Sequence, residues 1–405
     1  MDVTIRTITQ EELVPFLQAN DAAFSSAPSE EDIERARKLV ELDRCFVALD
    51  GTDMVGTAAV FTMPMTIPGG ELDVGYVTGV GVKPTHRRRG INTGLMRTQL
   101  EQARERGEPV DVLYASEGGI YGRFGYGLAT FGLAMEVDSA RAAFVRGYRP
   151  SGSIHLAEWG DALPRILAVH HAVRPRRPGM VALDEARLQD TLHEHGSEKE
   201  LPLFVALHEG DDGMDGYVLY RVRHEWPAGM PQSTLMVKDL QATTPGANAD
   251  LWRYVFDVDL TEKVGAWNRA VDDPLLHLVA EPRRLRATVR DNLWLRLVDV
   301  AAALAARRYA SPGEVVLEVQ DRFCSWNDGR YLLEVAPDGT ASAGPTNREP
   351  DLVCPVSELG AAYLGGTSFR RLQRAGLVEE RSDGALARAD AMFTWDPAPW
   401  SPYVF

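Results

Sequence analysis

The sequence predicts an α/β (α+β) fold of three consecutive domains, at residues 1–148, 149–285 and 286–405. In the first region, strand-like stretches alternate with helical patterns, which is typical of a mixed α/β sheet. The order strand, strand, strand, helix recurs in the second region, and a different order follows in the third. A chain of 405 residues also exceeds the length that one hydrophobic core usually serves, so we expect separate domains.

The spacing of apolar residues places the elements of the first region. We expect strands at 45–49, 54–62, 74–82, 110–115 and 129–137. We expect helices at 11–18, 30–42 and about 91–106, and a short helix near Ile120. Gly75, Gly79 and Gly81 interrupt the strand at 74–82. Glycine inside a strand often marks a bulge, or a place where a ligand approaches the backbone.

The second and third regions show the same two periodicities. In the second we expect strands at 204–208, 216–222 and 233–240, then a helix at 247–258. The connection after Asp239, LQATTPGANAD, contains no arginine cluster, so we expect this copy to lack an anion site. In the third we expect helices at 293–306, 355–364 and 368–375, and strands at 314–320 and 330–335.

The charge balance limits the classes of partner. Lys and Arg total 43 and Asp and Glu total 58, which gives a net charge of −15. Because phosphate contacts need a basic face, we expect no nucleic acid partner. Acidic residues that line a cleft would attract cations or polyamines, and solubility alone is the alternative reason for the acidity.

Membrane and export signals are missing from the sequence. No stretch approaches the roughly 20 uninterrupted apolar residues of a membrane span. The first residues, MDVTIRTITQEELVPF, lack the layout of a signal peptide. Cys45, Cys324 and Cys354 are few and widely spaced, which argues against a disulfide framework. We therefore expect a cytoplasmic protein with no membrane partner.

The segment THRRRGIN (85–92) joins the strand at 74–82 to the helix at 91–106. Backbone N–H groups at a helix start lack intrahelical partners, and the helix dipole favours an anion there. Gly90 lets the backbone close around phosphate oxygens, and Arg87, Arg88 and Arg89 add positive charge. We expect a pyrophosphate site at this turn, and a solvated basic turn is the alternative.

The same segment resembles the acetyl-CoA motif of the GNAT N-acetyltransferases. The stretch V-x-V-x-P-x-x-R-R-R-G runs from Val80 to Gly90. The family pattern is [Q/R]-x-x-G-x-[G/A], in which Arg87 and Gly90 match and Asn92 departs at the last position. The resemblance implies acetyl-CoA as the co-substrate and no metal. The residues that we expect at acetyl-CoA are Val80, Gly81, Val82, Arg87, Arg88, Arg89, Gly90, Ile91, Asn92, Thr93, Ser116 and Glu117.

The whole chain resembles one branch of this family, the Eis (enhanced intracellular survival) acetyltransferases of actinobacteria. The spacing of the motifs, the three regions, the length and the C-terminal Phe405 carry this resemblance. It implies an active GNAT domain, a second GNAT-like domain without cofactor, and a domain like sterol carrier proteins. It also implies a homohexamer, a trimer of dimers, that acetylates aminoglycoside-like polycations, in some cases at several positions. Acetylation of protein lysines is the alternative activity.

A tyrosine motif supplies the candidate general acid. The pattern Y-x-x-F-G-Y from Tyr121 to Tyr126 is similar to the GNAT segment that carries the catalytic tyrosine. A tyrosine pKa of about 10 lies above that of a typical thiol, so its hydroxyl can protonate the departing thiolate. The resemblance selects Tyr121, while from the residues alone Tyr114, Tyr121 and Tyr126 are each equally suited to packing in the core.

The expected central strand of the first region offers no general base, because 74–82 contains no Asp, Glu or His. The Eis resemblance implies that the terminal carboxylate of Phe405 serves as the base. The tail WDPAPWSPYVF is aromatic and braced by proline, which favours a docked end over a disordered one. A tail that only packs against its own domain is the alternative.

Other residues give weaker indications. Asp21 and Phe24 are candidates for the amine pocket, as an acid and a ring, and structural roles suit them equally. His193 and His195 stand at i, i+2 with no third ligand nearby, so we assign no metal to them. The competing class of function is a lipid- or ligand-binding protein in which the GNAT domain is vestigial.

Overall fold

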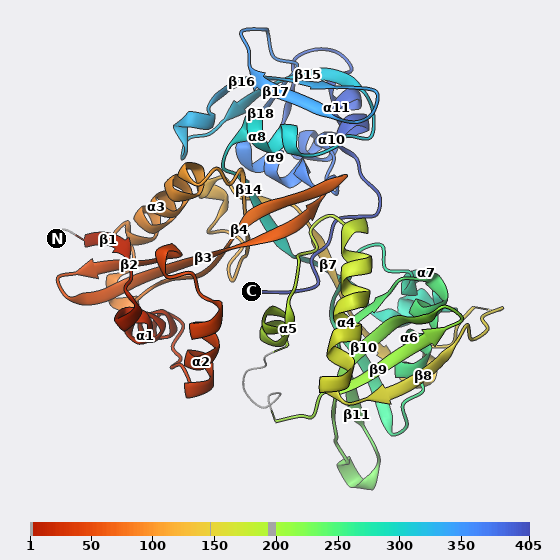
Figure 1. Ribbon diagram of the computed structural model, residues 1–405. Coiled ribbons are helices and arrows are strands. Elements are labelled where there is room, and N and C mark those ends of the chain that lie inside the picture. Colours follow the sequence, from red (N-terminus) through yellow and green to blue (C-terminus); the bar gives the residue numbers. More distant parts are fainter. Residues whose placement is uncertain (1–2, 146, 193–199) are drawn as a thin grey trace. The chain divides into compact units, whose positions relative to one another are not determined.

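The computed structural model describes residues 3–145, 147–192 and 200–405, and Figure 1 shows its elements. The chain divides into two compact units. Unit 1 contains Met1–Thr130, Asn292–Asp396 and Phe405, and unit 2 contains Phe131–Asp291 and Pro397–Val404. In the described part of the chain, no helix combines the length and the apolar character that crossing a bilayer requires.

Unit 1 contains a mixed sheet of strand order β1-β2-β3-β4-β5-β14-β6. Its strands are β1 (Val3–Thr7), β2 (Cys45–Asp50), β3 (Asp53–Ile67), β4 (Gly70–Val82), β5 (Val110–Tyr114), β6 (Gly127–Leu128) and β14 (Leu293–Leu297). The helices are α1 (Leu13–Ala23), α2 (Glu30–Leu39) and α3 (Ile91–Glu105). Neighbouring strands pair antiparallel, except that β4 and β5 are parallel.

The period of two along β2 explains how helices cover both faces of this sheet. Cys45 and Val47 point to the face covered by α1, where they pack in one buried cluster. Phe46 and Ala48 point to the opposite face and pack in the cluster that contains Ile91 and other residues of α3. Because successive side chains of a strand alternate between faces, one short apolar strand supplies two cores. Figure 1 shows α1 and α3 on opposite sides of the strands.

A smaller sheet of order β17-β16-β15-β18-β19 forms the rest of unit 1. Its strands are β15 (Gly313–Gln320), β16 (Gly329–Val335), β17 (Ala341–Pro345), β18 (Leu352–Pro355) and β19 (Glu379–Glu380). The helices of this part are α8 (Val300–Ala306), α9 (Val356–Tyr363), α10 (Phe369–Arg374) and α11 (Ala385–Phe393).

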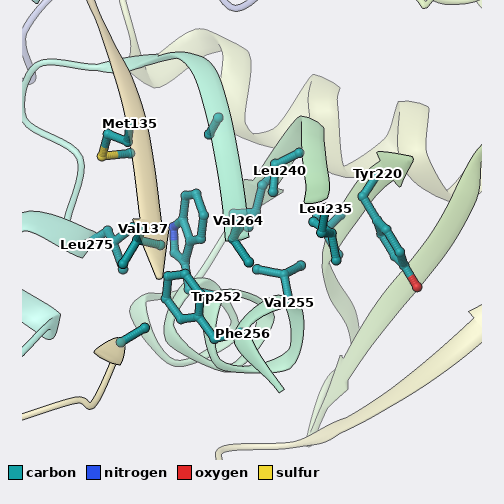
Figure 2. Close-up of a cluster of buried hydrophobic side chains, with 14 of the residues drawn as sticks. Met135, Val137, Tyr220, Leu235, Leu240, Trp252, Val255, Phe256, Val264 and Leu275 are labelled. Atoms are coloured by element: carbon teal, nitrogen blue, oxygen red, sulfur yellow. The ribbon is translucent and has the colours of Figure 1, made fainter. Parts of the chain in front are cut away.

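Unit 2 has a sheet of order β13-β7-β12-β11-β10-β9-β8. Its strands are β7 (Phe131–Asp138), β8 (Ser153–Ala157), β9 (Phe204–Gly210), β10 (Gly213–Arg223), β11 (Ser233–Ala242), β12 (Thr261–Ala270) and β13 (Thr288–Asp291). The helices are α4 (Trp159–Val173), α5 (Glu185–Thr191), α6 (Pro245–Phe256) and α7 (Leu275–Leu278). Trp252 of α6 packs in the core against β7, β11 and β12 through neighbours such as Met135, Leu240 and Val264, as Figure 2 shows.

The structure corrects one predicted helix. Residues 293–306 form strand β14 and the separate helix α8. Leu293, Leu295 and Leu297 alternate along the strand and are fully buried. Asp299 then caps α8, because its carboxylate accepts a hydrogen bond of 2.9 Å from the N–H of Ala302. Asp299, as an N-cap residue, was the feature of the sequence that indicates a new helix after the strand.

Two strands also join sheets that sequence order does not suggest. The predicted strand at 129–137 appears as β7, but it pairs with β12 and β13 in unit 2. Strand β14 pairs with β5 and β6 in unit 1. Strand pairing is set by tertiary contacts that local patterns do not contain. The domain boundaries at 148 and 285 therefore stay a prediction.

Asp111 of β5 is a carboxyl group in an unusual, fully buried position. The residue is fully buried, and neither carboxylate oxygen has a hydrogen-bond donor in bonding geometry among the described residues. Burial raises the pKa of Asp111 to about 7, although the charge of Arg44 opposes this shift. The folded chain therefore binds this proton more tightly than the unfolded chain, in which an aspartate pKa is about 4.

We predict that Asp111→Asn stabilises the protein at alkaline pH. Because the folded pKa is raised, stability from this group is complete below about pH 4 and is lost as the pH rises through 7. The neutral amide removes that loss, so the free energy of unfolding at pH 8 should rise by about 4 kcal/mol relative to wild type. Urea titrations at pH 5 and pH 8 measure it. An identical pH dependence in the two proteins would contradict the assignment.

Candidate functional site

A cavity of about 340 Å³ lies in unit 1 beside the end of β4 and the start of α3. Its lining residues are Ala23, Phe24, Val80, Gly81, Val82, His86, Arg87, Arg88, Gly90, Ile91, Asn92, Thr93, Ser116, Glu117, Ile120, Tyr121 and Arg123. Of the residues predicted to contact acetyl-CoA, Arg89 alone is outside the lining. Of the two predicted for the amine, Phe24 lines the cavity and Asp21 does not.

The cavity opens because β4 and β5 separate. The two parallel strands are in register only at Gly75 with Asp111 and at Tyr76 with Val112. Strand β4 continues to Val82, and β5 ends at Tyr114. Backbone N–H groups of β4 beyond Tyr76 that face this opening therefore have no ladder partner on β5, which leaves them available to a bound ligand.

A bulge in β4 lies at the same place. The register with β3 shifts between Thr57 and Ala59, so that one residue of β3 opposes Gly79 and Val80. Asn20 holds the bulge, because its Nδ2 donates to the Gly79 carbonyl at 2.7 Å and to Thr57 Oγ1 at 2.9 Å. The Thr57 hydroxyl also donates to the Gly79 carbonyl, at 2.9 Å. Bulges next to functional sites redirect the strand and end its pairing.

Gly81 allows helix α1 to reach the cavity. A Cβ atom at Gly81 would lie 2.8 Å from Cβ of Ala23 and 3.4 Å from Cε2 of Phe24. Glycine at this position therefore lets the end of α1 lie directly against β4. The Phe24 ring is 53 % exposed and forms part of the cavity wall.

The turn before α3 has the backbone of an anion site. Gly90, the N-cap residue, has φ +79°, and Arg88 has φ +62°, so both lie in the left-handed region. For Arg88 this conformation costs on the order of 1 kcal/mol. Left-handed residues in a turn direct successive N–H groups inward, and the first N–H groups of α3 have no intrahelical acceptor. The turn thus combines backbone donors with two arginines that line the cavity.

Arg87 is bound to the protein as well as facing the cavity. Its Nη2 donates to the Ala23 carbonyl at 3.1 Å, and its Nε lies 3.5 Å from the Val82 carbonyl oxygen. These contacts tie the turn to α1 and β4. Arg88 has no comparable contact to the backbone in the described residues, so of these two arginines it has the guanidinium that is available to a ligand in the cavity.

Tyr121 alone of the three candidate tyrosines lines the cavity. Burial raises the pKa of its hydroxyl above the ordinary value. The Tyr114 hydroxyl donates to Oδ1 of Asn292 at 3.2 Å. The Tyr126 hydroxyl is fully buried and accepts a hydrogen bond of 3.2 Å from Gln99 Nε2. Tyr121 therefore differs from Tyr114 and Tyr126, whose hydroxyl groups are hydrogen-bonded to other side chains of the protein.

The end of the chain is docked, as the aromatic tail predicted. In unit 1, the Phe405 ring contacts Tyr76, Tyr114 and Phe61, with centroid distances of 4.8, 5.2 and 5.7 Å. Tyr76 belongs to β4, the strand that borders the cavity. In unit 2, Tyr403 is buried.

Within unit 2, Pro397–Val404 occupy the space where β11 and β12 separate. These parallel strands are in register only as far as Val237. Beyond that point, the Tyr403 hydroxyl donates to Asp239 of β11 at 2.7 Å. Asn268 of β12 donates through Nδ2 to the carbonyl oxygens of residues 401 and 402, at 3.0 Å each. The second sheet thus has an opening like that of the first, filled by the chain itself.

Several residues of the site were not predicted from the sequence. His86 and Arg123 line the cavity, and His86 Nε2 lies 3.3 Å from Oδ2 of Asp50. His86 lies within THRRRGIN and Arg123 within the Y-x-x-F-G-Y pattern. Their location inside these two motifs could have identified them. Asn20 and Thr57 gave no signal, because their contacts join distant parts of the chain.

The predicted absence of a metal stays a prediction. His193 and His195 lie outside the residues that the structure describes. Within the described ranges, no group of three or more His, Cys, Asp and Glu side chains is arranged to hold a metal ion.

Three protein families match the chain. Residues 4–129 and residues 179–297 match two families of acetyltransferase (GNAT) domain, and residues 300–402 match the sterol carrier protein domain family. The fold therefore consists of two GNAT domains and a C-terminal domain like sterol carrier proteins, as the resemblance implied.

Relatives match over the full length. An uncharacterized N-acetyltransferase of Streptomyces avermitilis is 41% identical, with 100% of both chains covered. N-acetyltransferase Eis of Mycobacterium tuberculosis is 33% identical, also with 100% of both covered. The crystal structure of Eis1 from Mycobacterium abscessus is similar, with a TM-score of 0.86, 35% identity, and 99% of this chain and 100% of that chain covered.

Proposed function

This chain belongs to the Eis family of GNAT N-acetyltransferases, and on that premise we propose that it transfers an acetyl group from acetyl-CoA to an amine. The observation that carries the proposal is the cavity at the separated ends of β4 and β5, bordered by the arginine turn of α3. The family relationship makes the protein an acetyltransferase, while acetyl-CoA and the amine are our assignments.

The donor is assigned to the turn and the bulge. The phosphates of acetyl-CoA bind the N–H groups at the start of α3 together with Arg87 and Arg88. Backbone N–H groups of 80–82 bind the pantetheine arm and polarise the acetyl carbonyl as negative charge develops on its oxygen. Ser116 and Glu117 line the opposite wall. Arg89 lies outside the cavity lining, so we assign it no direct contact with acetyl-CoA.

Tyr121 is assigned as the general acid that protonates the departing thiolate of coenzyme A. Its hydroxyl has a raised pKa and therefore stays protonated at neutral pH. The terminal carboxylate of Phe405 is assigned as the general base that accepts a proton from the amine. Two observations support this: residues 74–82 contain no Asp, Glu or His, and the Phe405 ring packs on Tyr76 of the same strand.

The acceptor is assigned as a polycationic amine of the aminoglycoside type. A net charge of −15 favours the approach of such a molecule. Phe24 contributes its ring to the cavity wall. Asp21 lies one turn earlier on α1, outside the lining, and is assigned a supporting role through its negative charge. A protein lysine is the alternative acceptor. The relationship with Eis also supports a homohexamer, and the buried, unpaired cysteines suit the cytoplasm.

The substrate assignment predicts acetylation of an aminoglycoside at a higher kcat/KM than a lysine peptide. A panel of one aminoglycoside, one linear polyamine and one lysine peptide, followed by thiol release and product mass, measures this. A preference for the peptide would support the alternative activity. Binding of a lipid without any acetyl transfer would instead support the vestigial-domain hypothesis.

The acid assignment predicts that Tyr121→Phe lowers kcat about a hundredfold, with the KM for acetyl-CoA within about twofold. Because the raised pKa keeps the hydroxyl protonated, the wild-type rate should not fall on the alkaline side below about pH 10. Tyr114→Phe is the matched control, since that hydroxyl binds Asn292. A loss in Tyr114→Phe without one in Tyr121→Phe would reassign the acid.

The base assignment predicts that extending the chain beyond Phe405 abolishes turnover. Three added glycines move the carboxylate away from its place, so kcat should fall by about a hundredfold or more. Binding of acetyl-CoA should remain, because the cavity lining includes no residue of the tail. The same glycines added at the N-terminus are the control. Wild-type turnover in the extended protein would refute the assignment.

A further inference from the structure

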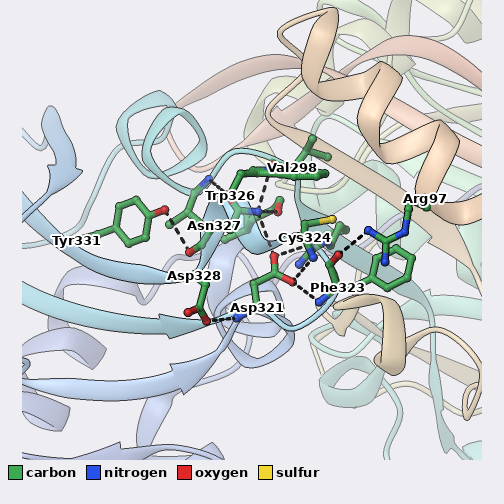
Figure 3. A network of polar contacts seen from close by, with 12 residues as sticks. Arg97, Val298, Asp321, Phe323, Cys324, Trp326, Asn327, Asp328 and Tyr331 are labelled. Carbon is green, nitrogen blue, oxygen red and sulfur yellow. Dashed lines mark hydrogen bonds and ion pairs between the residues drawn. The ribbon is translucent and has the colours of Figure 1, made fainter.

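The connection between β15 and β16, residues 321–328, is a tightly bonded loop of the sterol-carrier-like domain. Asp321 is buried, and its Oδ1 accepts hydrogen bonds from the N–H groups of Phe323 and Cys324, at 3.1 and 2.9 Å. Its own N–H donates to Asp328 Oδ1 at 3.0 Å, and Asn327 Nδ2 donates to its Oδ2 at 3.2 Å. Figure 3 shows these contacts converging on Asp321. These hydrogen bonds fix the backbone of the loop and so fix the position from which the Phe323 side chain extends.

Phe323 joins two elements that border the cavity. The guanidinium carbon of Arg97, on α3, lies 4.5 Å from the centroid of the Phe323 ring, and Arg97 Nη1 donates to the Phe323 carbonyl at 3.1 Å. On its other side, the Phe323 ring meets the Phe124 ring edge to face, with centroids 5.1 Å apart. Cation–π and edge-to-face aromatic contacts are both attractive, so they hold the Phe323 ring between α3 and Phe124.

Phe124 transmits this contact to Tyr121. The two rings lie 6.5 Å apart, and the N–H of Phe124 donates to the Tyr121 carbonyl at 2.9 Å. The N–H of Tyr126 donates to the same carbonyl at 3.3 Å. The turn 121–126 is thus closed on the backbone of Tyr121, and Phe323 packs on its buried face.

Arg296 makes a second link between the loop and the turn. Its Nη2 donates to Asp321 Oδ2 at 2.5 Å, and both side chains are buried. A Cβ atom at Gly125 would lie 2.2 Å from Arg296 Nη1, so the guanidinium lies directly against the turn. Gly125 also has φ +84°, a conformation that favours glycine.

We propose that Phe323 is a positioning residue of the acetyltransferase site, through which the sterol-carrier-like domain fixes the turn of Tyr121 against α3. This inference rests on the proposed role of Tyr121. It gives the third domain a part in acetyl transfer that requires no ligand of its own. Without the Phe323 ring, Phe124 loses its outer support and Tyr121 samples positions from which it does not reach the thiolate.

A double-mutant cycle tests the proposal. Phe323→Ala should lower kcat about tenfold, with both KM values within about twofold of wild type. The kcat of Phe323→Leu should lie between those of Phe323→Ala and wild type. In a Tyr121→Phe background, Phe323→Ala should lower kcat by less than about twofold, because the residue acts through the hydroxyl already removed. Trp326→Ala is the matched control: its ring lies 4.8 Å from the Arg104 guanidinium carbon, further along α3, so kcat should stay within about twofold of wild type.

Hydrogen exchange gives a readout that does not depend on turnover. The amides of Phe124 and Tyr126 should exchange faster in both Phe323 variants than in wild type and in Trp326→Ala. Unchanged exchange, or losses of kcat that multiply fully in the double mutant, would overturn the proposal. An unchanged kcat in Tyr121→Phe alone would instead refute the assigned acid, which separates failure of the proposed function from failure of this inference.

Discussion

The early end of pairing between β4 and β5 is the constraint on which the site of unit 1 depends. The parallel strands are in register at only two positions, and β4 then runs on to Val82 without pairing to β5. Backbone donors that leave a sheet must find another partner. The bulge held by Asn20, the approach of α1 over Gly81 and the turn into α3 all lie around this opening. Together these features surround the gap between the two strands and form a cavity lined by hydrogen-bond donors.

The sheet of unit 2 repeats this break with a different occupant. Its parallel pair, β11 and β12, also separates after a short register, but the connection to α6 starts from the N-cap Thr244 and contains no arginine. The space is filled by the chain's own tail, held by Asp239 and Asn268. The same strand separation thus leaves a cavity in unit 1 and holds a peptide segment in unit 2. The sequence expectation that the second copy lacks an anion site stays a prediction.

The parts of the site that are local in sequence could be predicted, and those that depend on tertiary contacts could not. Short motifs contain both the turn at Arg87–Gly90 and Tyr121, and the residue types in these motifs indicate the chemistry. Asn20 looks like any polar residue of a helix until β3 and β4 bring Thr57 and Gly79 to it. For the same reason, β7 and β14 were not assigned to their sheets. The error at 293–306 was different, since the alternating leucines and the Asp299 cap were both present in the sequence.

Calorimetric titration of acetyl-CoA tests most directly whether the opening beside β4 is the donor site. We predict that the wild type binds acetyl-CoA, that Arg88→Ala weakens binding at least about tenfold, and that Arg89→Ala changes it by less than about twofold. The two variants remove the same charge from adjacent positions, and only Arg88 lines the cavity. Absence of binding by the wild type, or equal losses in the two variants, would contradict it.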